Sequence, residues 1–200
     1  DATPPTNVTF DDKIADGGSY DYDAVPAQPT CTADGAVSGL ASCVVSGYST
    51  SVGPHTLTAT ATDNAGNTAT AARSYTVLGL TFSGFYSPVS MPPAYNTVKG
   101  GNTVPLKFEV FKGSVELTDP SIVQPIKVGT IACPPPGTVP TNNITATTTG
   151  DTGLRYVSSS GQFVYSWKTP VPSGSAPRCY SVTISLKDGV SQKTAYFQLK

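Results

Sequence analysis

Apolar and polar residues alternate with a period of two along most of the chain, and this pattern predicts a protein built from β-strands. The clearest example is residues 55–62, which read HTLTATAT. No stretch of ten or more residues keeps apolar positions at helical spacing without an intervening Gly or Pro. We therefore expect an all-β fold.

The strongest hairpin signal lies in the first half of the chain. The alternating strand ends at Asp63-Asn64-Ala65-Gly66-Asn67, where Asn and Gly supply the positive φ angles that a tight turn needs. Residues 68–77 then form the returning strand, with Tyr75 and Val77 on one face. Shorter strands are expected before this hairpin, at residues 7–10, 20–22 and 42–45.

A change of composition at Leu78-Gly79-Leu80 marks a domain boundary, because aromatic residues become more frequent there and the Ala/Thr alternation ends. We expect one domain at residues 1–78 and a second at 79–200. In the strand 103–111, the apolar residues at even positions share a face that should be buried, while the other face should be mostly solvated. Further strands are expected at 81–86, 122–131, 143–149, 154–157, 162–167, 179–187 and 191–199, the last two joined by Asp188-Gly189.

Turn signals every eight to twelve residues are typical of antiparallel β-sandwiches, so two such sandwiches in tandem fit the chain best. Composition agrees, with 19 Gly, 18 Pro and only 12% charged residues. The net charge of −1 provides no basic field, which argues against nucleic-acid binding. No apolar run approaches the about 20 residues that cross a bilayer, so we expect no membrane span.

The four cysteines, Cys31, Cys43, Cys133 and Cys179, form no CxxC pair and have no neighbouring His, which favours disulfides over zinc. We predict one bridge inside each domain, Cys31–Cys43 and Cys133–Cys179. Paired cysteines, low charge and abundant Thr and Ser indicate a secreted, extracellular or cell-surface protein. The chain begins at Asp1 without a leader, which we interpret as a mature or excised piece of a longer protein.

Two stretches of the first half carry a family resemblance. Residues 31–47 read CTADGAVSGLASCVVSG, and residues 51–67 read SVGPHTLTATATDNAGN. They resemble the bacterial Ig-like and HYR-like modules found in secreted actinobacterial and other bacterial surface proteins. The resemblance implies an Ig-like β-sandwich over most of residues 1–78.

The second half looks like the PxKF domain, whose namesake motif is Pro105-Leu106-Lys107-Phe108 in this chain. The resemblance rests on residues 84–111, which read GFYSPVSMPPAYNTVKGGNTVPLKFEVF, and on Trp167–Pro170 and Cys179-Tyr180. Such domains usually occur at the C-terminus of long secreted or cell-surface proteins. The resemblance implies a second Ig-like sandwich, an accessory role and, as partners, the catalytic or other domains of a longer parent chain.

The residues offer no catalytic constellation. His55 is the only histidine, and its place at a turn leading into a strand is not the strained elbow of a nucleophile. Neither a GxSxG nor a HExxH motif occurs, and bridged cysteines are not nucleophiles. We expect no enzymatic activity in these 200 residues.

An acidic segment near the N-terminus is the one candidate for a metal site. Five carboxylates lie within thirteen positions, at Asp11, Asp12, Asp16, Asp21 and Asp23. Calcium sites need six to eight oxygen ligands, and this segment has the oxygens to form one, although EF-hand spacing is absent. The alternative interpretation, a solvated acidic loop, is the one that we favour, and we expect no cofactor.

Aromatic residues are the remaining candidates for binding, because sugar rings stack on exposed aromatic faces. We expect Phe163, Tyr165 and Trp167 to lie on one side of their strand, with the single Trp in the core.

The loops 86–97 and 169–178 are stiffened by prolines, which lowers the entropic cost of holding a binding surface. Within them, Tyr86, Tyr95 and Arg178 are the side chains best suited to contact a polysaccharide.

Three functions therefore compete. The first is a non-catalytic accessory region that serves as a spacer, stabilising or attachment module of a secreted or cell-surface bacterial protein. The second is a carbohydrate- or polymer-binding module that targets an extracellular hydrolase to its substrate, and the third is protein adhesion. A binding module should expose two or three coplanar aromatic rings, whereas a spacer should not.

Overall fold

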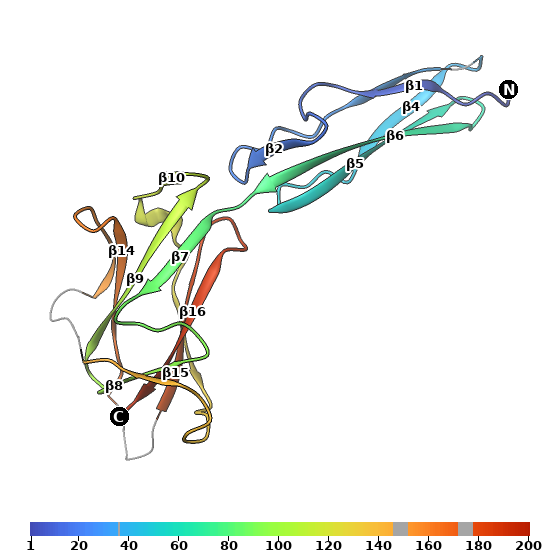
Figure 1. The fold of residues 1–200 in the computed structure, drawn as a ribbon. Helices are drawn as coiled ribbons and strands as arrows, with labels where there is room; N and C mark the ends of the chain where they lie inside the picture. Colours follow the sequence, from blue (N-terminus) through green and yellow to red (C-terminus); the bar gives the residue numbers. More distant parts are fainter. Residues whose placement is uncertain (36, 146–151, 172–177) are drawn as a thin grey trace. The chain divides into compact units, whose positions relative to one another are not determined.

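The computed structural model describes residues 1–35, 37–145, 152–171 and 178–200. The chain divides into two compact units, Asp1–Gly79 and Leu80–Lys200 (Figure 1). Each unit consists of two sheets whose apolar faces form a core between them, and the regular structure is almost entirely strand. The prediction of an all-β chain with two tandem sandwiches is therefore confirmed.

Unit 1 contains a small sheet and a larger one. Its strands are β1 (Thr6–Phe10), β2 (Gly18–Asp21), β3 (Cys31–Asp34), β4 (Leu40–Ser46), β5 (Gly53–Asp63) and β6 (Thr68–Leu78). β1 pairs with β3, and the larger sheet has the order β2-β6-β5-β4. The predicted hairpin is β5–β6, whose register runs without a shift from Gly53 opposite Val77 to Thr62 opposite Thr68.

The core of unit 1 follows from the alternation along this hairpin. Leu57 and Ala59 of β5 are fully buried, and Tyr75 and Val77 of β6 lie in the same apolar cluster. The partly buried Val8, Phe10 and Cys31 of the small sheet pack against this cluster, so the two sheets share one core. Tyr75 keeps its hydroxyl satisfied, because it donates to the carbonyl of Ser49 at 2.6 Å and accepts from the Ser49 amide at 2.8 Å.

The turn of the hairpin is held by a buried carboxylate. Asp63 accepts hydrogen bonds from the backbone amides of Ala65 and Asn67 at 2.9 and 2.8 Å, and from the Asn67 side chain at 2.9 Å. Hydrogen bonding by Asn67 holds the pKa of Asp63 below its ordinary value. Gly66 has a φ of 88°, the conformation that the sequence predicts for this turn.

Unit 2 is a sandwich of two larger sheets. Its strands are β7 (Thr81–Tyr86), β8 (Tyr95–Val98), β9 (Thr103–Lys112), β10 (Val115–Glu116), β11 (Lys127–Ile131), β12 (Thr141–Asn143), β13 (Gly153–Val157), β14 (Gln162–Lys168), β15 (Arg178–Ser185) and β16 (Gln192–Leu199). One sheet has the order β10-β9-β14-β13, with β7 also paired to β9. The other sheet has the order β11-β15-β16-β8-β12.

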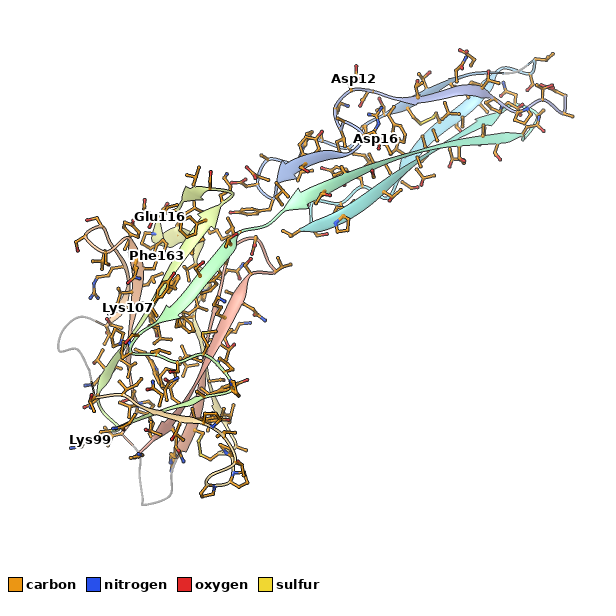
Figure 2. The ribbon with its side chains drawn as sticks, in the orientation of Figure 1. Asp12, Asp16, Lys99, Lys107, Glu116 and Phe163 are labelled. Atoms are coloured by element: carbon orange, nitrogen blue, oxygen red, sulfur yellow. A yellow bond between two sulfur atoms is a disulfide. The ribbon has the colours of Figure 1, made fainter. Side chains whose placement is uncertain are left out.

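The predicted buried face of β9 is confirmed. Val104, Leu106, Phe108 and Val110 are all fully buried, whereas Lys107 between them is half-buried on the opposite face. β14 lies beside β9, with Phe163 opposite Phe108 in the register (Figure 2). The two rings stack with their centroids 5.3 Å apart, which fills the centre of this sheet's inner surface.

The structure differs from the expected strands in several places, and β3, β8 and β10 were not expected from the sequence. The strand expected at 122–131 begins only at Lys127, because a short 3-10 helix, Pro120–Ile122, precedes it and is capped by the side chain of Asp119. The strand expected at 143–149 ends at Asn143 as β12, and residues 146–149 lie outside the described part of the chain.

Among the described strands, three pairs are parallel, namely β2–β6, β8–β16 and β8–β12. The expectation of antiparallel sandwiches does not include such pairs. Alternation identifies the buried face of a strand but contains no information about the direction of its neighbour, so the pattern does not distinguish the two kinds of pair.

The buried carboxylate of Asp188 accepts a hydrogen bond from Leu80, the first residue of unit 2. The Leu80 amide donates to Asp188 Oδ2 at 2.8 Å, and the Ser191 hydroxyl donates to the Leu80 carbonyl at 2.8 Å. The same Ser191 hydroxyl lies 2.6 Å from Asp188 Oδ2, so its single proton is shared between this carboxylate and the Leu80 carbonyl, and the Ser191 amide donates to Asp188 Oδ1 at 2.9 Å. The predicted turn Asp188-Gly189 therefore joins β15 to β16 and also holds the beginning of β7.

Both predicted disulfides are present. Cys31 pairs with Cys43 across a sequence separation of 12, and Cys133 pairs with Cys179 across a separation of 46. The first links β3 to β4 and therefore connects the two sheets of unit 1. The second ties the segment after β11 to β15.

We predict that the longer disulfide loop stabilises more than the shorter one. In the chain-entropy model, replacing Cys133 and Cys179 by Ser should lower the free energy of unfolding by about 4 kcal/mol, and replacing Cys31 and Cys43 by about 3 kcal/mol. Urea unfolding of the two double variants, each followed in its own unit by a fluorescence or NMR probe, measures both losses. A larger loss for Cys31 and Cys43 would contradict the prediction.

We also predict a pH-dependent contribution from Asp188. Burial alone would raise its pKa, but hydrogen bonds from Ser191 and Leu80 outweigh burial and lower the pKa below its ordinary value. A lowered pKa stabilises the fold above the ordinary pKa of Asp, and this stabilisation is lost as the pH falls through the folded-state pKa. Asp188→Asn should therefore be less stable than wild type at pH 7, and the difference should shrink on acidification.

Thermal unfolding between pH 2 and pH 7 measures this difference. The matched control is Asp12→Asn, because Asp12 is exposed and has no hydrogen-bond partner among the described residues. Equal stability of Asp188→Asn and wild type at pH 7 would contradict the assigned role of Asp188.

Candidate functional site

Trp167, the single tryptophan of the chain, lies in the core of unit 2. It is 5% exposed, and its ring centroid is 4.7 Å from that of Phe197 and 6.0 Å from that of Tyr180 on the facing sheet. The prediction that Trp167 belongs to the core is confirmed. Trp167 therefore offers no face to a ligand.

Tyr86 is the last residue of β7, and its side chain is hydrogen-bonded to a residue of the same sheet. Its hydroxyl donates to Glu109 Oε2 at 2.9 Å, and Glu109 Oε1 accepts from Gln162 at 3.4 Å. Burial, together with the Glu109 carboxylate, raises the pKa of Tyr86. The Tyr86 hydroxyl, which would have to bond a sugar, is therefore already hydrogen-bonded to Glu109, in a row of polar side chains that crosses β7, β9 and β14.

Tyr95 lies in the other sheet and stacks on a second tyrosine. It begins β8 beside Tyr196 of β16, and the two ring centroids are 5.2 Å apart with an angle of 25° between the ring planes. Rings at this separation lie face to face, so each covers one face of the other and the pair does not form a flat platform. The sequence does not identify Tyr196 as part of this surface, because Tyr95, the residue that it stacks on, is 101 positions away in the chain.

The face of β8, β15 and β16 that holds the two tyrosines is largely uncharged, and the exposed Lys127 of the adjoining β11 lies at its border, opposite Thr183. β15 and β16 place Ser181 beside Tyr196 and Thr183 beside Thr194, and the two threonine hydroxyls lie 2.8 Å apart. These residues alternate with the buried Val182, Ile184 and Ala195, so they face away from the core. The outward face of β8, β15 and β16 thus presents mainly hydroxyl and phenol groups, and we call it the tyrosine face.

Arg178 stands apart from Tyr95 on the same sheet. It begins β15 opposite Leu199, and Leu199 in turn lies opposite Val98 at the far end of β8. Three residues along the strands and two strands across correspond to roughly 14 Å between Tyr95 and Arg178. Because Tyr86 belongs to the other sheet, the structure does not bring the three predicted residues together into one site.

Buried Asn96 is the residue that fixes the loop before β8. Its Oδ1 accepts from the Ser90 amide at 2.8 Å and from the Asn142 side chain at 2.9 Å. Its Nδ2 donates to the carbonyls of Ser90 and Tyr196 at 2.9 and 3.0 Å. The predicted loop 86–97 is therefore held by side-chain bonding in addition to its prolines. In the second predicted loop, residues 172–177 lie outside the described part of the chain.

A shallow hollow lies at one side of the sandwich of unit 2, where the segment after the 3-10 helix passes beside β13 and β14. It measures about 460 Å³ and is open to solvent. The lining residues are Val123, Gln124, Pro125, Ile126, Leu154 and Tyr165. Burial raises the pKa of Tyr165. Sequence reasoning missed this hollow because the chain topology, rather than any local motif, assembles it.

In the acidic segment of unit 1, Asp11 and Asp16 are already bonded to other residues of the unit. Asp11 accepts from the amide and hydroxyl of Thr30 at 3.1 and 3.0 Å and pairs with Lys13 at 2.9 Å. Asp16 accepts from the Ser74 amide at 2.8 Å, and such bonds lower the pKa of both carboxyls. Within the described residues, no group of three or more His, Cys, Asp or Glu side chains is arranged to hold a metal ion.

His55 has no catalytic surroundings. Its Nε2 lies 2.6 Å from the carbonyl oxygen of Ser51, and its ring is 5.3 Å from that of Tyr75. All four cysteines are in disulfides. Among the described residues, no helix has the length and apolar character needed to cross a membrane.

Comparisons with known proteins add little. No protein-family model matches the chain, and no curated protein matches it. Among solved structures, a tandem of titin Ig domains has 9% identity and a TM-score of 0.29, over 99% of both chains. An endo-fucoidan hydrolase from glycoside hydrolase family 107 has 12% identity and a TM-score of 0.23, over 79% of this chain and 22% of that one. These TM-scores are too low to carry an argument about function.

We predict that calcium does not stabilise the chain. A ligand that binds only the folded state stabilises it by about 2.7 kcal/mol at one hundred times its Kd, which raises Tm measurably. Because Asp11 and Asp16 already accept protein hydrogen bonds, Tm should be the same in millimolar Ca²⁺ and in EDTA. A rise in Tm with Ca²⁺ that Asp12→Asn or Asp16→Asn abolishes would contradict this prediction.

Proposed function

We propose that this chain is a non-catalytic accessory region of a secreted or cell-surface bacterial protein, with an Ig-like, HYR-like module followed by a PxKF-type domain. Its role is that of a spacer that separates the other domains of the parent chain from their point of attachment. The observation that carries the proposal is that each candidate aromatic residue is engaged by other residues of the fold. Trp167 is in the core, Tyr86 bonds Glu109, and Tyr95 stacks on Tyr196.

Covalent cross-linking supports the extracellular part of the proposal. Each unit holds one disulfide, and disulfides form and persist where thiols oxidise. A low content of charged residues and a net charge of −1 fit a passive segment rather than one that attracts a charged partner.

A second candidate function, carbohydrate binding, is favoured by one observation. The tyrosine face is largely uncharged and rich in hydroxyl groups, and the outer surfaces of Tyr95 and Tyr196 are partly exposed. Such a face suits a neutral polysaccharide, whose hydroxyls exchange hydrogen bonds with Ser and Thr and whose CH groups contact aromatic rings. In this role, the chain would target an extracellular hydrolase to its substrate.

Retention on insoluble polysaccharides distinguishes the two functions. For a spacer, the whole chain should be retained on cellulose, chitin and xylan no more than serum albumin is. Retention of the wild type that falls several-fold in Tyr95→Ala would favour the carbohydrate function and overturn the spacer. Tyr86→Phe is the matched control, since it changes a tyrosine of the other sheet and leaves the tyrosine face intact.

A further inference from the structure

Two pairs of tyrosine rings are in contact among the described residues, one in each unit. In unit 2, Tyr95 and Tyr196 lie directly opposite each other on the parallel strands β8 and β16, with ring centroids 5.2 Å apart and ring planes at 25°. In unit 1, Tyr20 and Tyr75 meet edge to face at 6.4 Å. Because neighbouring strands are about 4.8 Å apart, the backbone itself holds the first pair at close range.

The two pairs differ in how their phenol groups are used. Tyr75 is only 2% exposed, and its hydroxyl both donates to and accepts from the backbone of Ser49. The Tyr20 hydroxyl accepts from the Ala15 amide at 2.8 Å. By contrast, Tyr95 and Tyr196 are both partly exposed, and neither hydroxyl has a hydrogen-bond partner among the described residues. A reagent in solution can therefore reach the pair in unit 2.

The row of residues that contains this pair leaves its rings room to move. Ser181 of β15 lies opposite Tyr196 on one side, and Thr141 of β12 lies opposite Tyr95 on the other. Both neighbours are small, and rotation of a tyrosine ring about χ2 meets only a broad torsional minimum. The stacked rings can therefore turn until their edges meet.

The covalent links of unit 2 do not include its last strand. The Cys133–Cys179 disulfide reaches β15, whereas β16 is joined to its neighbours β15 and β8 by strand hydrogen bonds. A bond between Tyr95 and Tyr196 would fasten β16 to β8. It would also close a loop that contains both of these cysteines.

We propose that Tyr95 and Tyr196 are a modification site, at which a haem peroxidase with hydrogen peroxide joins the two rings into a dityrosine. The proposal goes beyond the spacer function and rests on it only for the extracellular location, an oxidising compartment. It gives a role to the one exposed tyrosine pair of the chain, and that role requires no bound ligand.

The reaction balances without any further reagent. Each phenol gives up one electron and one proton to the oxidant and becomes a phenoxyl radical, whose unpaired electron is shared with the Cε atoms beside the oxygen. The two radicals combine through one Cε atom of each ring, which forms a carbon–carbon bond. The hydrogen on each bonded Cε then leaves as a proton while the phenol oxygen takes one up, which restores both aromatic rings. Two hydrogen atoms thus leave the protein, and they reduce one hydrogen peroxide to two waters.

Treatment of the whole, disulfide-bonded chain with a haem peroxidase and limiting hydrogen peroxide tests the proposal. The expected product is a monomer that has lost two hydrogen atoms and shows the blue fluorescence of dityrosine. Its yield should not change over a dilution series, because the two rings belong to one molecule. After reduction and trypsin digestion, residues 74–99 should be joined to residues 194–200, and fragmentation should place the bond at Tyr95 rather than Tyr75 or Tyr86.

Conservative variants isolate the two phenols. Tyr95→Phe and Tyr196→Phe keep a ring in place but remove the hydroxyl that is oxidised, so each should lower the yield of the cross-linked monomer at least about tenfold. Tyr86→Phe is the matched control from the same tryptic peptide and should leave the yield unchanged. Peroxidase treatment should raise the Tm of the wild type, because a cross-link restricts the unfolded chain, and should not raise that of Tyr95→Phe.

A yield that falls on dilution, a bond between other tyrosines or an undiminished yield in Tyr95→Phe would overturn the site. These outcomes are independent of polysaccharide retention. A chain that is neither retained on polysaccharide nor cross-linked keeps the spacer function and loses the site. A chain that is retained through Tyr95 and also forms the cross-link loses the spacer function and keeps the site.

Discussion

The bonding of each unit's last strand to a strand from its beginning is the interaction on which the other strands depend. Hairpins such as β5–β6 and β15–β16 are local, so they bring neighbouring residues together at little entropic cost. β2–β6 and β8–β16 join residues separated by most of a unit, so bringing these strands together costs more chain entropy than closing a local hairpin. Through these pairs the last strand of each unit becomes an inner member of a sheet, with a second neighbour on its other side.

Much of the fold is readable from the sequence because a two-layer sandwich imposes a simple rule on each strand. Every second residue faces the core, so the buried positions of β9 and the β5–β6 hairpin follow from alternation alone. The disulfides follow from the division into two domains, since each half contains two cysteines. The parallel pairs do not follow, because β2 and β8 are only four residues long and alternation is blind to direction.

The candidate site was less readable for a related reason. Sequence reasoning identified Tyr95 as a surface aromatic but grouped it with Tyr86 and Arg178, which lie on a different sheet and at a distant register position. Nearness in sequence or shared loop chemistry does not place residues on one face; the order of strands does. Asn96 and Asp188 show the same limit, since both look like loop residues yet are buried among partners distant in sequence, Asn142 and Leu80.

The Cys133–Cys179 bond has a consequence for what a proteolytic cut does to unit 2. Proteases cut exposed loops first, and the largely exposed segments 134–140 and 158–161 lie between these two cysteines. A single cut anywhere between the two cysteines leaves both products covalently joined, because the disulfide bridges the break. The two pieces of unit 2 would therefore stay joined after such a cut, and one proteolytic event in this region would not separate them.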